Sequence, residues 1–151
     1  MRHRAAEKPH YELVQLMKTK WNRLRERHLP AVERVAIIEE ILGHVRGKIQ
    51  DVAAKHDSTR VIQCILQYGN KEQREQVLTE VISKVVEFSK QPYAHFLVLK
   101  MVTYCTSSKE KEQIFEALQG SMNELAAHVI GCRVRATCVF VLCVLCAFID
   151  F

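Results

Sequence analysis

HDSTRVIQCILQYGN, at residues 56–70, is the most informative stretch of this chain. As a helix, it places Thr59, Arg60 and Gln63 on one polar face. The opposite face then carries an aliphatic stripe made of Val61, Ile62, Ile65 and Leu66. A helix that buries one side and exposes short polar side chains on the other suits a surface that contacts something flat.

The end of this stretch predicts a tight corner between two helices. Gly69 is placed to close the helix in the left-handed conformation that glycine adopts without steric cost. Asn70, with Gln73 three positions later, has the spacing of a capping box that begins the next helix.

The same pattern returns along the chain. A shift of 36 residues brings 61–62 onto 97–98, and a shift of 37 brings 74–77 onto 111–114. Apolar and charged classes match more often than identities, as expected when only the packing role repeats. A period of this length indicates a helical solenoid, in which each unit buries its apolar face against the next.

These residues carry a resemblance to a known family. The run KHDSTRVIQCILQYGN at 55–70, with its period, resembles Pumilio (PUF) repeats, and KPHYELV at 8–14 resembles the Pumilio homolog 3 (Puf-A) branch of that family. The resemblance covers about residues 8–130 and implies an all-α, right-handed helical solenoid with about two and a half three-helix repeats. It also implies that the chain is an N-terminal part of a longer array with an unrelated ending.

The resemblance implies an RNA-binding site on the middle helix of each repeat, where two side chains contact a base edge and a third stacks between bases. Carried onto the first repeat, Thr59 and Gln63 contact the base edge and Arg60 stacks through its guanidinium.

In the second repeat the same positions are His95, Phe96 and Leu99. Phe96 is able to stack on a base, or is an ordinary core residue. His95 offers one hydrogen bond, whereas Leu99 offers none. This departure from the family pattern predicts binding with little sequence preference, mainly through the nucleic-acid backbone.

Composition supports a helical chain with three regions. Of 151 residues, 48% are hydrophobic, which argues against disorder. The chain has only five glycines and three prolines, which argues for helix. The regions are a basic N-terminal segment with a first helix (1–30), the repeats (31–134) and an apolar, cysteine-rich tail (135–151). The net charge of +5 resides in residues 1–30, and the remainder is neutral. The first helix, over about 11–28, either caps the first repeat or contacts phosphates through its cations.

The third repeat is expected to fail, because Arg135 occupies a position that is Ile62 and Val98 in the earlier repeats. The apolar run 136–149 would span roughly 21 Å as a helix, less than the ~30 Å of a bilayer core, so packing onto the array is favoured over membrane anchoring or aggregation. Cys143 and Cys146 have the spacing of half a zinc site without a second pair, so no metal is expected.

No catalytic motif is found. His56, Asp57 and Ser58 share the letters of a hydrolytic triad, but adjacent residues on one turn of helix point in different directions. Asp57 is interpreted as a helix N-cap. The chain opens without a secretory signal, so reduced thiols are expected. The sequence therefore predicts a protein that is not an enzyme and that uses no cofactor or small-molecule substrate.

Two functions remain open. The resemblance implies binding of RNA, with DNA as an alternative, in the nucleus and nucleolus, on pre-ribosomal particles during ribosomal-RNA processing for the large subunit. The alternative is a HEAT-like scaffold that binds proteins and not nucleic acid, which the neutral charge of residues 31–151 favours.

Overall fold

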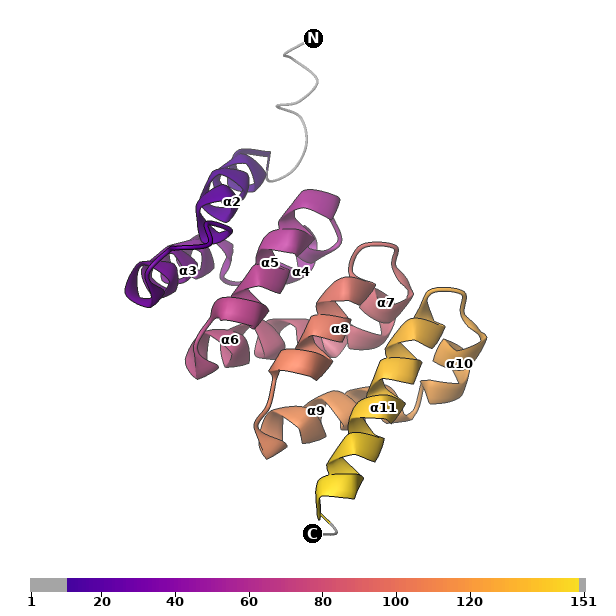
Figure 1. The fold of residues 1–151 in the computed structure, drawn as a ribbon. Helices are drawn as coiled ribbons and strands as arrows, with labels where there is room; N and C mark the ends of the chain where they lie inside the picture. Colours follow the sequence, from indigo (N-terminus) through magenta and orange to yellow (C-terminus); the bar gives the residue numbers. More distant parts are fainter. Residues whose placement is uncertain (1–10, 150–151) are drawn as a thin grey trace.

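The computed structural model describes the backbone of residues 11–149 and the side chains of residues 11–141. The described residues form α-helices joined by short turns and one 3-10 helix, with no strand among them (Figure 1). The helices are α2 (Tyr11–Leu24), α3 (Ala31–Val45), α4 (Ile49–Ala53), α5 (His56–Tyr68), α6 (Lys71–Val81), η1 (Ile82–Lys84), α7 (Val85–Lys90), α8 (His95–Tyr104), α9 (Ser108–Gln119), α10 (Met122–Ala127) and α11 (Gly131–Ile149).

The helices repeat in the order short, inner, outer. Two complete units, α4–α5–α6 and α7–α8–α9, are flanked by α2–α3 on one side and α10–α11 on the other. The inner row consists of α2, α5, α8 and α11, each packed on the next, and the outer helices lie behind it (Figure 1). The prediction of an all-α solenoid of three-helix repeats is confirmed.

The aliphatic stripe of α5 lies at the centre of the core. Val61, Ile62, Ile65 and Leu66 are all fully buried. The equivalent pair on α8, Leu97 and Val98, is also fully buried. Each buried branched side chain contributes about 1.5–3 kcal/mol to folding. This burial orients both inner helices, so that their polar sides face away from the outer helices.

The corner after α5 forms as a capping box but not as a left-handed turn. Asn70 Oδ1 accepts from the Gln73 amide (2.8 Å), and Gln73 Oε1 accepts from the Asn70 amide (3.1 Å), as predicted. Ser107 and Glu110 form the same box before α9. Gly69, however, has φ −69° and ψ 161°, so the predicted left-handed cap is wrong. Glycine is favoured there because a Cβ would lie 2.5 Å from the Ile65 carbonyl oxygen.

Polar contacts tie each unit to its neighbour. The Glu80 carboxylate on α6 accepts from the amides of Gly47 (2.9 Å) and Ile49 (3.3 Å), at the start of α4. Gly47 itself has a φ of 71°, which favours glycine. Arg74 on α6 donates to the carbonyl oxygen of Tyr104 at the end of α8 (2.9 Å). These links join adjacent units and help to fix their stacking.

The third inner helix forms, contrary to the sequence expectation. Gly131–Ile149 is one helix that packs on α8 and α10. Val134 and Cys138 are fully buried, whereas Arg135 is exposed. The arginine is accommodated because this position is not covered in α11 as it is in α5 and α8. The boundary proposed at 134/135 falls inside α11.

Other expectations for the tail fall partly outside the described residues. The side chains of Cys143 and Cys146 lie beyond them, as does the N-terminal run of residues 1–10. In the part that is described, Cys64, Cys105, Cys132 and Cys138 are free thiols, and no cluster of potential metal ligands is present. Within residues 11–149, no helix combines the length and apolar character needed to cross a membrane.

Two glycine substitutions test the corner. Gly69→Ala is expected to lower the free energy of unfolding by about 1–3 kcal/mol, because the new methyl group meets backbone. Gly43→Ala is the matched control. Gly43 is exposed within α3, and nothing lies within 4 Å of the added Cβ. Gly43→Ala should therefore raise the free energy of unfolding by about 0.5–1 kcal/mol. Urea unfolding followed by circular dichroism measures both. Equal effects of the two substitutions would contradict the close approach at Gly69.

Candidate nucleic-acid interface

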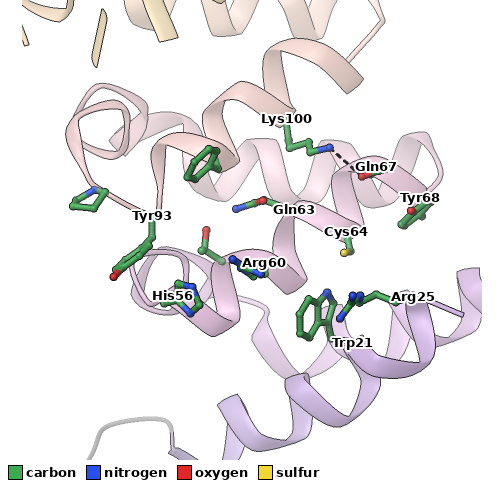
Figure 2. Close-up of a pocket in the computed structure, with 13 residues that line it drawn as sticks. Trp21, Arg25, His56, Arg60, Gln63, Cys64, Gln67, Tyr68, Tyr93 and Lys100 are labelled. Carbon is green, nitrogen blue, oxygen red and sulfur yellow. Dashed lines mark hydrogen bonds between the residues drawn. The ribbon is translucent and has the colours of Figure 1, made fainter. Parts of the chain in front are cut away.

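A groove of about 580 Å³ runs between α2, α5 and α8 on the inner side of the array (Figure 2). Four aromatic rings and three permanent cations line it, together with His56, Thr59, Gln63, Cys64, Gln67 and Pro92. The aromatic residues are Trp21, Tyr68, Tyr93 and Phe96, and the cations are Arg25, Arg60 and Lys100. The inner helices therefore form one wall that combines flat apolar faces with positive charge.

The three sequence-predicted residues of α5 all line this groove, at different depths. Arg60 is exposed and makes no hydrogen bond or ion pair with the described residues. Gln63 is half-buried. Thr59 is only 2% exposed, and its hydroxyl is buried without a hydrogen-bond partner among the described residues. The guanidinium of Arg60 is thus free to stack, whereas Thr59 lies at the floor of the groove.

The two predicted site residues of α8 differ in their exposure. Phe96 is 45% exposed and lines the groove, so it is not an ordinary core residue. His95 is 2% exposed, is not part of the groove lining, and places Nδ1 3.0 Å from the Gln91 carbonyl oxygen. The ring centroids of His95 and Phe96 lie 3.9 Å apart. His95 therefore lies beneath Phe96, and the geometry removes it from the candidate contact surface.

Charge is segregated across the molecule. The groove lining contains three permanent cations and no carboxylate. Residues 31–151 are neutral in total, but none of the described carboxylates belongs to the groove lining. The Asp57 carboxylate, one residue from the groove-lining His56, is bound by Lys18 Nζ at 2.5 Å. The inner face is therefore locally cationic, which the net charge of the repeats does not reveal.

The model of the Pumilio-family RNA binding repeat matches residues 58–82, in α5 and α6, and residues 84–118, in α7 to α9. Pumilio homolog 3 of Homo sapiens is 35% identical to the chain over 123 residues. The chain belongs to the Pumilio repeat family. That alignment covers 82% of this chain and 19% of the human protein, so the chain spans about a fifth of the length of this relative.

Other Pumilio proteins and solved structures agree. Pumilio homology domain family member 6 of Schizosaccharomyces pombe is 33% identical over 102 residues, covering 67% of this chain and 16% of that protein. The structure of human Puf-A in complex with DNA is 34% identical, with a TM-score of 0.78, covering 84% of this chain and 25% of that one. The Puf4 RNA binding domain bound to an RNA sequence has a TM-score of 0.73 at 14% identity, covers 91% of this chain and 39% of that one, and shows the shared fold.

Several groove residues were not identified from the Pumilio motif. Lys100 lies one turn beyond Phe96, with its amine 3.0 Å from Gln67 Oε1 and 4.8 Å from the Tyr104 ring centroid. Tyr93 precedes α8 and meets His56 edge to face at 4.9 Å. Lys100 could have been found from the sequence, because it lies four residues after Phe96 and thus on the same side of the helix. Tyr93 carried no such signal, because it lies in a turn.

Asp57 is not the N-cap that the sequence suggested. Lys55 occupies the cap position of α5 and makes no side-chain cap bond. The pKa of Asp57 is lowered from 3.8, chiefly by the hydrogen bond from Lys18 and then by that from His56. Asp57 thereby joins α2 to the first Pumilio repeat.

The Lys18–Asp57 pair predicts a small, pH-dependent effect on stability. Asp57→Asn should lower the free energy of unfolding by less than about 1 kcal/mol at neutral pH, because both side chains are more than 40% exposed and solvent screens them. A lowered folded-state pKa means that the contribution is present above pH 3.8 and is lost as the pH falls through the folded value.

Urea unfolding of the unmodified chain and of Asp57→Asn, from neutral to acid pH, measures the difference in the free energy of unfolding. Glu112→Gln serves as the matched control, because Glu112 is an exposed carboxylate on α9 that forms no ion pair with the described residues. The pairing is contradicted if the Asp57→Asn effect grows toward acid pH or equals that of the control.

Proposed function

We propose that this chain binds single-stranded RNA along the groove between α2, α5 and α8. The observation that carries the proposal is the lining itself, in which four aromatic rings and three cations occur without a carboxylate. Aromatic faces stack on bases of any sequence, and cations follow the phosphate backbone. Membership of a family named for RNA-binding repeats supports RNA as the ligand, and the DNA complex of human Puf-A supports nucleic acid in general.

Low sequence specificity follows from the positions that would contact base edges. Thr59 and His95 are each 2% exposed, and Leu99 has no polar group. Gln63 alone among these four positions is both polar and partly accessible. Each good base-edge contact discriminates by about 1–3 kcal/mol, so a single such contact gives only a modest preference.

The proposed activity is binding and not catalysis. Of the three triad-like residues, His56 and Asp57 contact each other, with His56 Nδ1 2.9 Å from Asp57 Oδ1, contrary to the expectation that adjacent residues point apart. Ser58 does not join them, because its Oγ donates to the Val52 carbonyl oxygen at 2.8 Å and the residue is fully buried away from the groove. Ser58 is therefore not placed to act as a nucleophile beside His56.

The resemblance to the Pumilio homolog 3 branch is the basis for proposing the cellular role. We propose that the chain acts in the nucleolus, on pre-ribosomal particles, during ribosomal-RNA processing for the large subunit. Imaging of the tagged chain with a nucleolar marker tests the location. Exclusion from the nucleolus would remove this part of the proposal and leave RNA binding in place.

The groove cations predict a salt dependence. With Arg25, Arg60 and Lys100 as the contacts, the slope of log affinity against log salt should be about −2 for single-stranded RNA. Arg60→Ala and Lys100→Ala should each reduce its magnitude by about 0.7. Fluorescence anisotropy with labelled oligouridylate, at several salt concentrations, measures the slope.

Lys71→Ala is the matched control, because it removes the same charge from the exposed start of α6. It should leave the slope unchanged. A failure of the unmodified chain to bind RNA at low salt would contradict the proposal and favour the protein-binding scaffold.

Equal-length homopolymers test specificity. Oligouridylate, oligoadenylate and oligocytidylate should bind with affinities within about tenfold of one another, because one accessible base-edge contact is available in the first repeat. A preference of several hundredfold for one sequence would show that Thr59 or His95 becomes accessible in the complex.

A further inference from the structure

The groove extends beyond the residues matched by the Pumilio repeat model. Trp21 in α2 and Arg25, which follows it, both line the groove, although the matched residues begin at 58. We propose that Trp21 and Arg25 form an additional stacking site for one nucleobase, ahead of the first matched repeat. The inference rests on the proposed RNA-binding function and adds a position to it.

The geometry of this pair differs from the other cation–aromatic pairs in the molecule. The Arg25 guanidinium lies 4.6 Å from the Trp21 ring centroid. In the pair of Arg34 with Tyr68 the arginine lies outside the groove lining, and in the pair of Lys100 with Tyr104 the ring does. Among the described side chains, Trp21 and Arg25 thus form a cation–aromatic pair that faces the groove with both members.

The three cations within α2 each have a carboxylate partner. Lys18 pairs with Asp57 (2.5 Å), Lys20 with Glu40 (2.7 Å) and Arg23 with Glu33 (2.9 Å). Arg25 has no carboxylate partner among the described residues. The cation that this part of the chain adds to the groove lining is Arg25, which follows α2.

The Trp21 indole lines the groove with the Arg25 guanidinium over its ring, 4.6 Å from the centroid. Trp21 is half-buried, packs against the core and lies next to Cys64 on α5. Burial raises the pKa of the Cys64 thiol, while a hydrogen bond with Trp21 and the charges of Lys100 and Arg25 lower it. Figure 2 shows Trp21 and Arg25 together on the α2 side, facing the part of α5 that carries Arg60 and Cys64.

A nucleobase fits this site better than a peptide side chain. The pair offers a flat apolar ring and a planar cation without a fixed counter-ion, which suits a stacked base joined to a phosphate. The neighbouring Arg60 and Phe96 offer the same two kinds of surface further along the groove. A strand that stacks on Phe96 and Arg60 would reach Trp21 by continuing in one direction.

The experiment uses the fact that Trp21 is the single tryptophan in the chain. Unlabelled oligouridylate is titrated into the whole chain at low salt while the indole emission is recorded, and labelled oligouridylate gives the affinity by anisotropy. The expected result is a saturable loss of emission whose midpoint coincides with that of binding. Trp21→Leu should weaken binding about 5- to 150-fold, as for loss of one stacked base, whereas Trp21→Phe should retain most of the affinity.

Phe115→Leu is the matched control, because it removes a partly buried ring that packs on the core from α9, outside the groove. It should leave affinity unchanged. If RNA binds but the Trp21 emission and the Trp21→Leu affinity stay unchanged, the additional stacking site is overturned and the proposed function stands. If RNA does not bind at low salt, the proposed function and this inference are both overturned.

Discussion

The burial of the aliphatic side of α5 is the constraint on which the rest of the structure depends. Val61, Ile62, Ile65 and Leu66 leave no accessible surface, so the rotation of α5 about its own axis is fixed. The same burial of Leu97 and Val98 fixes α8. Once both rotations are set, Arg60 and Phe96 must emerge on the same side of the array. The groove is a consequence of core packing.

The repeat, its period and its corners were predictable, because each depends on residues close in sequence. Alternation of apolar classes places Val61 and Leu97 in the core, and the Asn70–Gln73 capping box is closed within one turn of helix. Register also indicated that Arg60 and Phe96 lie on one exposed side, and both line the groove. These features need no knowledge of which helices become neighbours.

What was missed depends on neighbours. The cationic groove could not be predicted from the net charge, because a net charge sums over all faces of the molecule. In the structure, the carboxylates of Asp57, Glu40 and Glu33 pair with cations of α2. The burial of His95 was not predicted, because register alone does not show how α8 packs in the fold. The third inner helix was missed because Arg135 was compared with positions that are fully buried in α5 and α8, whereas Arg135 is exposed in α11. The charge distribution and the exposure of these two residues depend on how the helices pack, which the local sequence does not reveal.

The side-chain links between units join residues 30 to 39 positions apart, as in Glu80 to Gly47, Arg74 to Tyr104 and Lys18 to Asp57. In the described part of the chain, these bonds therefore join adjacent units, and none of them joins a unit to the one after its neighbour. Such a topology has low contact order and favours fast folding. Pulled from its ends, an array of this kind yields in successive steps, each releasing one helical layer, instead of failing all at once.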